Sequence, residues 1–212
     1  MAAVRGVAGQ ADPLPARLQR GELPIVPVQA VAAGEVLLSL NVSPTGSVGA
    51  VDVLRTTPPF TNTVVAAVRG WHFAPATDEQ RKPAASRVLV GAMFTSPSLR
   101  VPTVGEPAKD VAPAATSLPM PLTTAMPLYP PGARFAGTVM LETLVAPSGK
   151  VVAVTTIRSS PPFDEPAMEA ARGWLFRPPQ GPSLPANNYA YLIFAFRQPL
   201  VGASPPVGAS PR

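Results

Sequence analysis

Few side chains in this sequence of 212 residues are of the types that carry out catalysis. His72 is the one histidine and cysteine is absent, so a hydrolytic triad or a histidine or thiolate metal site lacks its residues. The densest acidic group is Asp164, Glu165 and Glu169, whose spacing suits the first turns of a helix, where the helix dipole favours negative charge. No glycine-rich phosphate loop is present. We therefore expect no enzymatic activity, no metal and no cofactor.

The most specific motif is Arg-Gly-Trp-x-Phe-x-Pro, which occurs at residues 69–75 and again at 172–178. Each copy carries an arginine, a tryptophan and a phenylalanine: Arg69, Trp71 and Phe73, then Arg172, Trp174 and Phe176. Buried aromatic side chains supply much of the stability of a small domain. The motif therefore predicts core residues that hold the end of a helix against a sheet.

The two motifs end two copies of one longer block. Residues 34–75 recur at 137–178 without a gap, and about 19 of the roughly 42 aligned positions are identical. Each copy keeps a proline and a glycine at the same spacing, with Gly46 and Gly149 as the glycines of a hairpin turn. This internal repeat indicates that one small fold is encoded twice.

Each copy predicts the same order of elements. An alternating strand leads through the hairpin turn to a second strand, at 48–55 and 151–158. A helix with an apolar stripe follows, and Asp164 is placed to cap it in the second copy. A further apolar strand then ends each copy, at 87–95 and 189–197. The predicted fold class is α+β, with two tandem small domains, each a three-stranded antiparallel sheet covered on one face by a helix.

Composition separates the predicted domains from the segments around them. Thirty prolines and sixteen glycines concentrate at both ends and in the middle of the chain. From this distribution we expect a flexible segment at 1–23, a first domain at 24–98, a proline-rich linker at 99–124, a second domain at 125–199 and a disordered tail at 200–212.

Charge and hydropathy exclude two classes of function. The formal net charge is +5, but only 14% of the residues are charged and no basic cluster forms, so we expect no nucleic-acid partner. No run of 18 or more apolar residues is present, and no signal peptide is recognisable at the N-terminus.

The second copy resembles the C-terminal domain of TonB, the periplasmic partner-binding part of bacterial energy transducers. The matching residues are Tyr129, Pro130, Ala133, Gly137, Val139, Gly149, Val151, Ser159, Ser160, Asp164, Ala167, Ala170, Arg172, Trp174, Phe176 and Pro178. The first copy is a degenerate match: Val26 stands in place of the tyrosine, Thr56 and Thr57 replace the serines, and Thr61 replaces the aspartate. Counted over both copies, the resemblance extends over most of the chain.

The resemblance implies how a partner would bind. Members of the family capture a short segment of an outer-membrane receptor along a sheet edge, by strand addition. In this chain the last strand of the second copy would be that edge, with the segment before the repeat nearby. The implied partner-binding residues are Tyr189, Tyr191, Leu192, Ile193, Phe194 and Phe196, together with Tyr129 and Pro130.

By the same resemblance we expect a periplasmic protein of the cell envelope that binds a TonB-dependent receptor or another envelope protein. Energy-dependent transport would involve inner-membrane motor proteins only if an anchor is missing from this sequence. The alternative is a structural module that scaffolds an envelope assembly, either by forming a homodimer through exposed last strands or by binding peptidoglycan.

Overall fold

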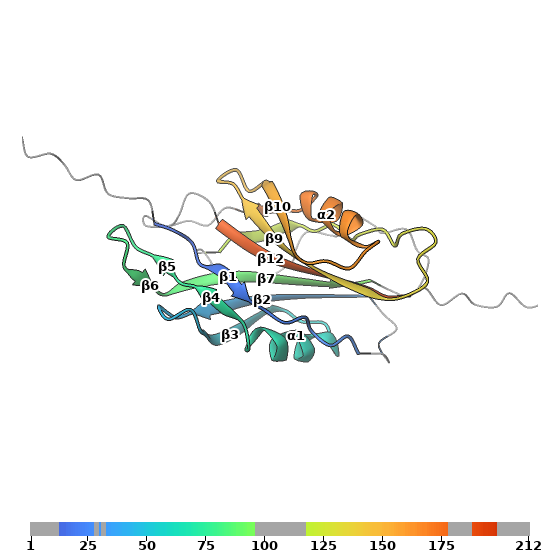
Figure 1. Cartoon of the computed structure of the whole chain (residues 1–212), viewed down its shortest axis with the longest axis horizontal. Coiled ribbons are helices and arrows are strands. Elements are labelled where there is room, and N and C mark those ends of the chain that lie inside the picture. Colours follow the sequence, from blue (N-terminus) through green and yellow to red (C-terminus); the bar gives the residue numbers. More distant parts are fainter. Residues whose placement is uncertain (1–12, 28–29, 31–32, 96–117, 178–187, 199–212) are drawn as a thin grey trace, which may run out of the picture.

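The computed structural model describes residues 13–27, 30, 33–95, 118–177 and 188–198. These residues contain two helices and a series of strands (Figure 1). In chain order the elements are β1 (Arg17–Arg20), β2 (Gly34–Val42), β3 (Val48–Arg55), α1 (Phe60–Val68), β4 (His72–Ala74), β5 (Ala76–Thr77), β6 (Pro83–Ala84), β7 (Ser86–Phe94), β8 (Met120–Thr123), β9 (Gly137–Val145), β10 (Val151–Arg158), α2 (Asp164–Arg172), β11 (Leu175–Arg177) and β12 (Asn188–Phe196). The fold is mixed α+β, as the sequence predicts.

Strands from both repeats form one six-stranded sheet, in the order β10-β9-β12-β7-β2-β3. Neighbouring strands are antiparallel except at the centre, where β7 and β12 run parallel, with Leu89 opposite Ala190 and Phe94 opposite Ala195. Each repeat contributes three adjacent strands to this sheet. The expectation of two separate three-stranded sheets is therefore wrong.

The composition of the two central strands explains this arrangement. In both β7 and β12 the last seven residues are buried, so each strand is apolar on both of its faces. Strands that are buried on both faces occur inside sheets and read as nearly continuous apolar runs. Pairing β7 with β12 therefore removes two apolar edges from water at once.

The two helices cover opposite faces of the sheet (Figure 1). Leu38 of β2 belongs to the apolar cluster that contains Phe60 and Val64 of α1, whereas Leu37 belongs to the cluster that contains Ala167 of α2. Successive side chains of a strand point to opposite faces, so these clusters lie on the two sides of the sheet. We call these sides the α1 face and the α2 face. Parallel central strands with helices on opposite faces result from an approximate two-fold rotation about an axis along the strands.

Each repeat begins with an arm that lies outside the six-stranded sheet. The first arm, residues 13–27, carries β1, which pairs with β4. The second arm, residues 118–133, carries β8, which pairs with β11. The first arm hydrogen-bonds to strands of the second repeat, since the amide N–H of Leu18 donates to Tyr191 of β12. The two repeats are thus joined by this arm as well as by the central strands.

These arms correct two of the expected boundaries. β1 lies within the segment at 1–23 that was expected to be flexible, and β8 lies within the expected linker at 99–124. Both arms are held by a tryptophan indole: Trp71 donates to the carbonyl of Glu22 at 2.9 Å, and Trp174 donates to the carbonyl of Ala125 at 3.2 Å. Sequence reasoning did not anticipate these bonds, because they join residues far apart in the chain. The expected tail at 200–212 lies outside the described residues.

The repeated aromatic motif and turn glycine contact each other. The amide N–H of Phe73 donates to the carbonyl of Gly46, and that of Phe176 donates to the carbonyl of Gly149, both at 2.8 Å. Gly46 has a φ of +84°, and a side chain there would meet the carbonyl oxygen of Phe73. The aromatic residues of the motif are buried: Trp71, Phe73, Trp174 and Phe176. The motif therefore acts in the structure as part of the core.

The beginning of each helix differs from the prediction. Asp164 is the first residue of α2 and makes no capping bond to the helix. Its carboxylate instead accepts a bond from the amide N–H of Ser160 at 2.8 Å and one from the hydroxyl of Ser159 at 2.6 Å. Thr61 accepts in the same way from the amide N–H of Thr57 at 2.9 Å. Both side chains therefore hold the loop that precedes the helix, and the predicted cap at Asp164 is wrong.

Candidate binding site

The strand that was expected to bind a partner lies in the middle of the sheet. β12 pairs with β9 along its whole length and with β7 from Ala190 to Ala195. Leu192, Ile193, Phe194 and Phe196 are at most 1% exposed. Strand addition needs a free row of backbone donors and acceptors, which β12 does not offer in this arrangement. The expectation that β12 is an edge strand is therefore wrong.

The sequence contains a signal for this position. β12 reads Asn-Tyr-Ala-Tyr-Leu-Ile-Phe-Ala-Phe and lacks the alternation of apolar and polar residues seen in a strand with one wet face. β10 reads Val-Val-Ala-Val-Thr-Thr-Ile-Arg and has an irregular pattern of exposed and half-buried residues. The continuous apolar run in β12 is therefore the sequence signal for a central strand, whereas the exposure of β10 is seen only in the structure.

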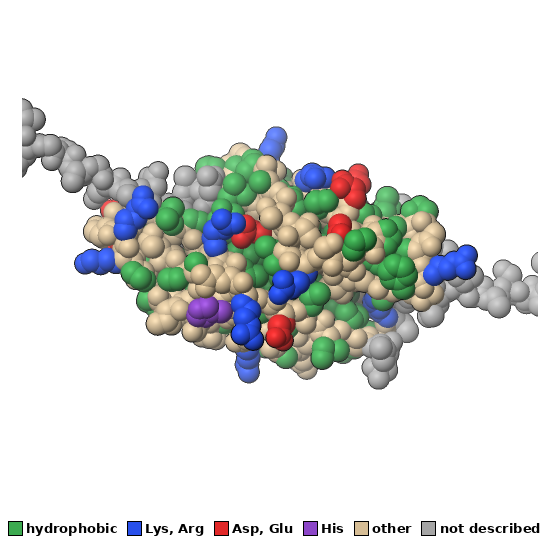
Figure 2. Space-filling model, in the orientation of Figure 1, with side chains coloured by type: hydrophobic (Ala, Val, Ile, Leu, Met, Phe, Trp, Pro, Cys, Tyr) green, Lys and Arg blue, Asp and Glu red, His purple; other side chains and the backbone are tan. Residues whose placement is uncertain are grey.

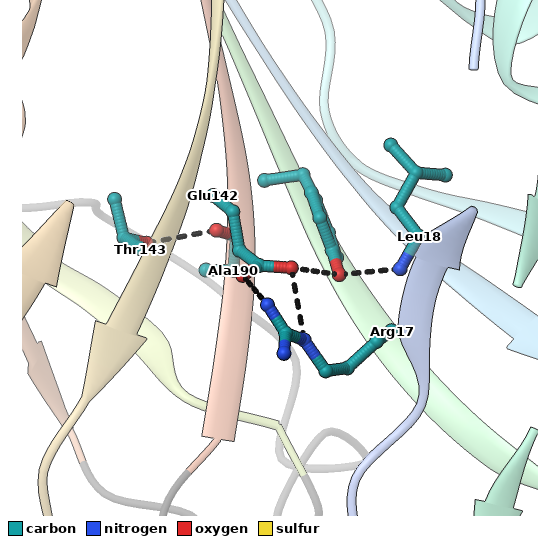
Figure 3. A network of polar contacts seen from close by, with 6 residues as sticks. Arg17, Leu18, Glu142, Thr143 and Ala190 are labelled. Atoms are coloured by element: carbon teal, nitrogen blue, oxygen red, sulfur yellow. Dashed lines mark hydrogen bonds and ion pairs between the residues drawn. The ribbon is translucent and has the colours of Figure 1, made fainter. Parts of the chain in front are cut away.

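A buried polar network joins the first arm to β9 and β12 (Figure 3). The carboxylate of Glu142 is only 4% exposed and forms an ion pair with the guanidinium of Arg17. It also accepts a bond from the hydroxyl of Tyr191 at 2.9 Å, and that hydroxyl accepts one from the amide N–H of Leu18 at 2.7 Å. We call Arg17, Leu18, Glu142 and Tyr191 the Glu142 network. The network supplies an ion pair and a hydrogen bond to the carboxylate of Glu142. Burial of a carboxylate without such partners would cost free energy.

The network shifts the pKa values of two of its members. Burial raises the pKa of the Tyr191 phenol well above its usual range, since it disfavours the charged phenolate. The hydrogen bond to Glu142 raises the pKa of Arg17, which therefore stays protonated. The guanidinium of Arg17 also lies 4.8 Å from the ring centre of Tyr189. Two of the predicted partner-binding tyrosines thus contact the protein's own first arm.

The remaining predicted contact residues lie on the second arm. The hydroxyl of Tyr129 donates to the carbonyl of Phe135 at 2.7 Å, and its ring lies 5.6 Å from that of Phe163. Pro130 accepts a bond from the amide N–H of Ala133, which closes a turn. The structure places Tyr129 in the apolar cluster of the α2 face, whereas Tyr191 belongs to that of the α1 face. The predicted site residues are therefore not gathered on one surface.

The approximate two-fold rotation places a different set of residues at the corresponding junction. By the register of the strand pairs, the counterparts of Arg17, Leu18, Glu142 and Tyr191 are Met120, Pro121, Ser39 and Leu89. Leu89 and Met120 belong to the same apolar cluster. At the first junction the amide N–H of Leu18 donates to the hydroxyl of Tyr191. Its counterpart Pro121 has no amide N–H, so no hydroxyl acceptor is needed at that position. The counterpart junction therefore lacks the buried ion pair: Leu89 and Met120 pack in an apolar cluster, and the hydroxyl of Ser39 accepts a hydrogen bond from the guanidinium of Arg87 at 3.1 Å.

β3 and β10 are the two edge strands of the six-stranded sheet. The edge of each strand pairs with no other described strand, except at the hairpin end. There the bridges Ser47–His72 and Lys150–Leu175 extend each hairpin to the short strand of the aromatic motif. Along β3 the ionised side chains are paired, Asp52 with Arg87 and Arg55 with Glu35. Along β10 no charged side chain occurs between Val151 and Ile157. These two strands are the candidate surfaces for strand addition.

A pocket of about 440 Å³ lies between the first arm, the β5–β6 hairpin and the start of β12. Pro13, Ala16, Thr77, Ser86 and Tyr189 are among its lining residues. The hydroxyls of Thr77 and Ser86 have no hydrogen-bond partner among the described residues. The lining residues also include Asp78, Glu79 and Arg87, so the pocket has charged as well as apolar walls, and none of its lining residues is a histidine.

Within the described ranges no group of three His, Asp or Glu side chains is arranged to hold a metal ion. His72 is exposed on β4. On the face shown in Figure 2, basic side chains lie scattered among neutral and apolar ones and form no single patch. No helix in the part of the chain that the structure describes has the length and apolar character needed to cross a membrane.

Comparison with known proteins supports the resemblance seen in the sequence. No curated protein matches the chain. Residues 126–197 match the family described as Gram-negative bacterial TonB protein C-terminal, a family of non-catalytic energy-transducer domains. The match extends from the second arm to the end of β12, and the first repeat lies outside it. The match supports the resemblance of the second repeat to the TonB C-terminal family.

Proposed function

We propose that this protein is a TonB-like component of the cell envelope that binds an extended segment of an outer-membrane receptor or transporter by strand addition. It catalyses no reaction in this role. The family match over residues 126–197 supports the class of partner. In strand addition, main-chain hydrogen bonds supply affinity, and pockets for alternate side chains supply selectivity.

One observation carries the proposal: the sheet has two outer strands, β3 and β10, whose outer sides pair with no other described strand over most of their length. β12 has no such side, because β7 and β9 occupy both. An incoming segment would therefore extend the sheet at an outer strand, without any need to separate the central pair. Where the protein acts with inner-membrane motor proteins, this binding would couple to energy-dependent transport.

The test uses the full chain and a peptide that carries a receptor's TonB-interaction segment. The peptide is titrated into isotope-labelled protein while the backbone amide resonances are followed by NMR. We expect shifts at residues 48–55 or 151–158 and little change at 188–196. A peptide of the same composition in scrambled order is the control. Absence of any shift at millimolar peptide would overturn the proposal.

The scaffold alternative has less support in the structure. A homodimer through exposed last strands requires β7 or β12 to be free, and these two strands pair with each other inside one chain. No observation among the described residues favours peptidoglycan as a ligand. A concentration-dependent dimer without peptide binding would nevertheless restore that alternative.

A further inference from the structure

The two outer strands differ in how they are protected against pairing with another strand. β3 contains Gly49 in its interior and carries Asp52 and Arg55, both held in ion pairs. Proteins commonly protect an edge strand with charges, because a flat apolar edge is a template for another strand. β3 therefore has a protected edge.

β10 lacks these protecting features. Its residues from Val151 to Ile157 contain no proline, no glycine and no charge, and six of the seven are β-branched. Val152 is 59% exposed and has no register partner on β9, since the pairing shifts between Val151 and Ala153. The outer side of this strand is thus a segment of high strand propensity that pairs with no described strand beyond Lys150.

Charges at the two ends of β10 indicate the chemistry of its partner. Lys150 precedes the strand and Arg158 ends it, and neither forms an ion pair with a described carboxylate. The guanidinium of Arg158 donates only to the carbonyls of Gly21 and Ile157, at 3.3 and 3.5 Å. Seven residues separate these two positions, so their Cα atoms lie roughly 27 Å apart in a strand. A partner strand would therefore meet a positive charge at each end and an apolar stretch between them.

This charge pattern disfavours a second copy of the same chain. Antiparallel pairing of two β10 strands would place Lys150 of one copy near Arg158 of the other, and like charges in that arrangement are destabilising. A segment with carboxylates at both ends would instead be complementary to the strand.

We propose that β10 is the accepting edge of this protein and that its ligand is an extended segment of another protein, with β-branched or apolar residues in the middle and a carboxylate at each end. The inference deepens the proposed function, because it names the edge and the kind of segment that the same sheet takes. It assigns this role to β10 and withholds it from both β3 and β12.

Two synthetic peptides test the inference with the full chain. Both have an alternating threonine and valine core of seven residues, and one has glutamate at each end, whereas the other has lysine. We expect the glutamate peptide to bind roughly tenfold more tightly at low salt, with the difference reduced at high salt. Equal affinity of the two peptides would overturn the assigned chemistry, and a dimer of the chain that competes with the peptide would overturn the choice of occupant.

Matched variants test the edge itself. Val152→Lys introduces a lysine on the outer strand, and Gly49→Lys makes the corresponding change on β3. At high salt, where attraction between the added lysine and the peptide's glutamates is screened, we expect Val152→Lys to weaken binding of the glutamate peptide at least tenfold and Gly49→Lys to leave it within twofold. Lys150→Glu should narrow or reverse the preference between the two peptides. Equal effects of the two lysine variants would overturn the assignment to β10.

The designed peptides contain no receptor sequence, so this test is separate from that of the proposed function. If the receptor segment binds and Val152→Lys does not affect it, the choice of β10 is wrong and the proposed function stands. If the glutamate peptide binds at β10 and no receptor segment does, the proposed function is wrong and the edge stands.

Discussion

The two halves of this protein share one architecture and differ in two places. Both have the hairpin, the helix, the buried aromatic motif and an apolar last strand, and the two last strands pair at the centre of one sheet. They differ where the arm meets the sheet: the Glu142 network lies at one junction, whereas at the other Leu89 and Met120 pack in an apolar cluster and Ser39 is bonded to Arg87. They also differ at the outer strand, which carries Asp52 in the interior of β3 and has no charge between Val151 and Ile157 in β10.

The difference shows which parts of the repeat the shared fold requires. Residues that close a turn, fill the core or hold an arm are the same type in both halves, as Trp71 and Trp174 are. Residues at the junction and the outer edge differ without a change of fold. We infer that the shared positions serve stability and that the divergent ones set how the first arm is held and what β10 binds.

The largest expected effect tests what the halves have in common. Gly34 and Gly137 lie against Phe60 and Phe163, and a methyl group there would come within 2.4 and 2.2 Å of ring carbons. Gly34→Ala and Gly137→Ala should each lower the free energy of unfolding by about 3 kcal/mol, because the buried rings have little room to move. Denaturant unfolding measures both values. A large loss in one variant and none in the other would show that the halves do not share this packing.

The next effect tests the polar junction. Arg17→Met and Glu142→Ser each place the counterpart residue of the other half in the Glu142 network. Each should cost about 2 kcal/mol, since a buried polar partner loses its bonds. The triple variant Arg17→Met, Glu142→Ser, Tyr191→Leu should lose less than the sum of its single changes by at least about 1 kcal/mol.

Met120→Ala on the second arm serves as the control for the junction. Its loss should simply add to that of Arg17→Met, because Arg17 pairs with Glu142 whereas Met120 packs in the apolar cluster of the α2 face. Strictly additive losses within the triple variant would mean that the Glu142 network is not an energetic unit.

A smaller effect follows from the raised pKa of the Tyr191 phenol. The folded state keeps this phenol neutral while the unfolded chain ionises near its usual pKa of about 10. The stabilisation is therefore complete below pH 10 and is lost as the pH rises, by about 1.4 kcal/mol at pH 11. The free energy of unfolding from pH 9 to pH 11 should fall more steeply in the native sequence than in Tyr191→Phe. Equal slopes would contradict a buried neutral phenol, because Tyr129 titrates in both proteins.

The smallest effect concerns a pair of arginines that both halves keep. The guanidinium of Arg172 lies 3.4 Å from the carboxylate of Glu165, and both side chains are largely exposed. Arg172→Ala and its counterpart Arg69→Ala should each change the stability by no more than about 0.5 kcal/mol. Thermal unfolding of both variants provides the measurement. A loss above about 2 kcal/mol in either would give the repeated arginine a structural role that its exposure does not suggest.

Local features of the fold could be predicted from the sequence, because neighbouring residues determine them. The glycine at Gly46 fixes a hairpin turn, and the apolar spacing from Phe60 to Val68 fixes a helix, in both cases within a few residues. The pairing of β7 with β12 joins residues about a hundred positions apart and depends on the burial of both faces. The unbroken apolar run in β12 was the available signal for that pairing.

The candidate site was harder to predict for the same reason. Glu142 appears in the sequence as the polar residue of an alternating strand, although its carboxylate is buried. Its partner Arg17 lies 125 residues away, in a segment whose composition predicts flexibility. The family resemblance, which the match over residues 126–197 supports, led to the wrong expectation that β12 is the binding edge. Only the three-dimensional pairing shows that β3 and β10 are the outer strands.

The central claim is that both halves form one cooperative unit around the β7–β12 pair. Trp71→Phe leaves Trp174 as the only tryptophan, in the second half, and Trp174→Phe leaves Trp71, in the first half. Guanidinium unfolding of each variant is followed by tryptophan fluorescence and by far-UV circular dichroism. The two curves should superimpose in a single transition for both variants. A biphasic dichroism curve, with each tryptophan following a different phase, would show two independent domains and contradict the account.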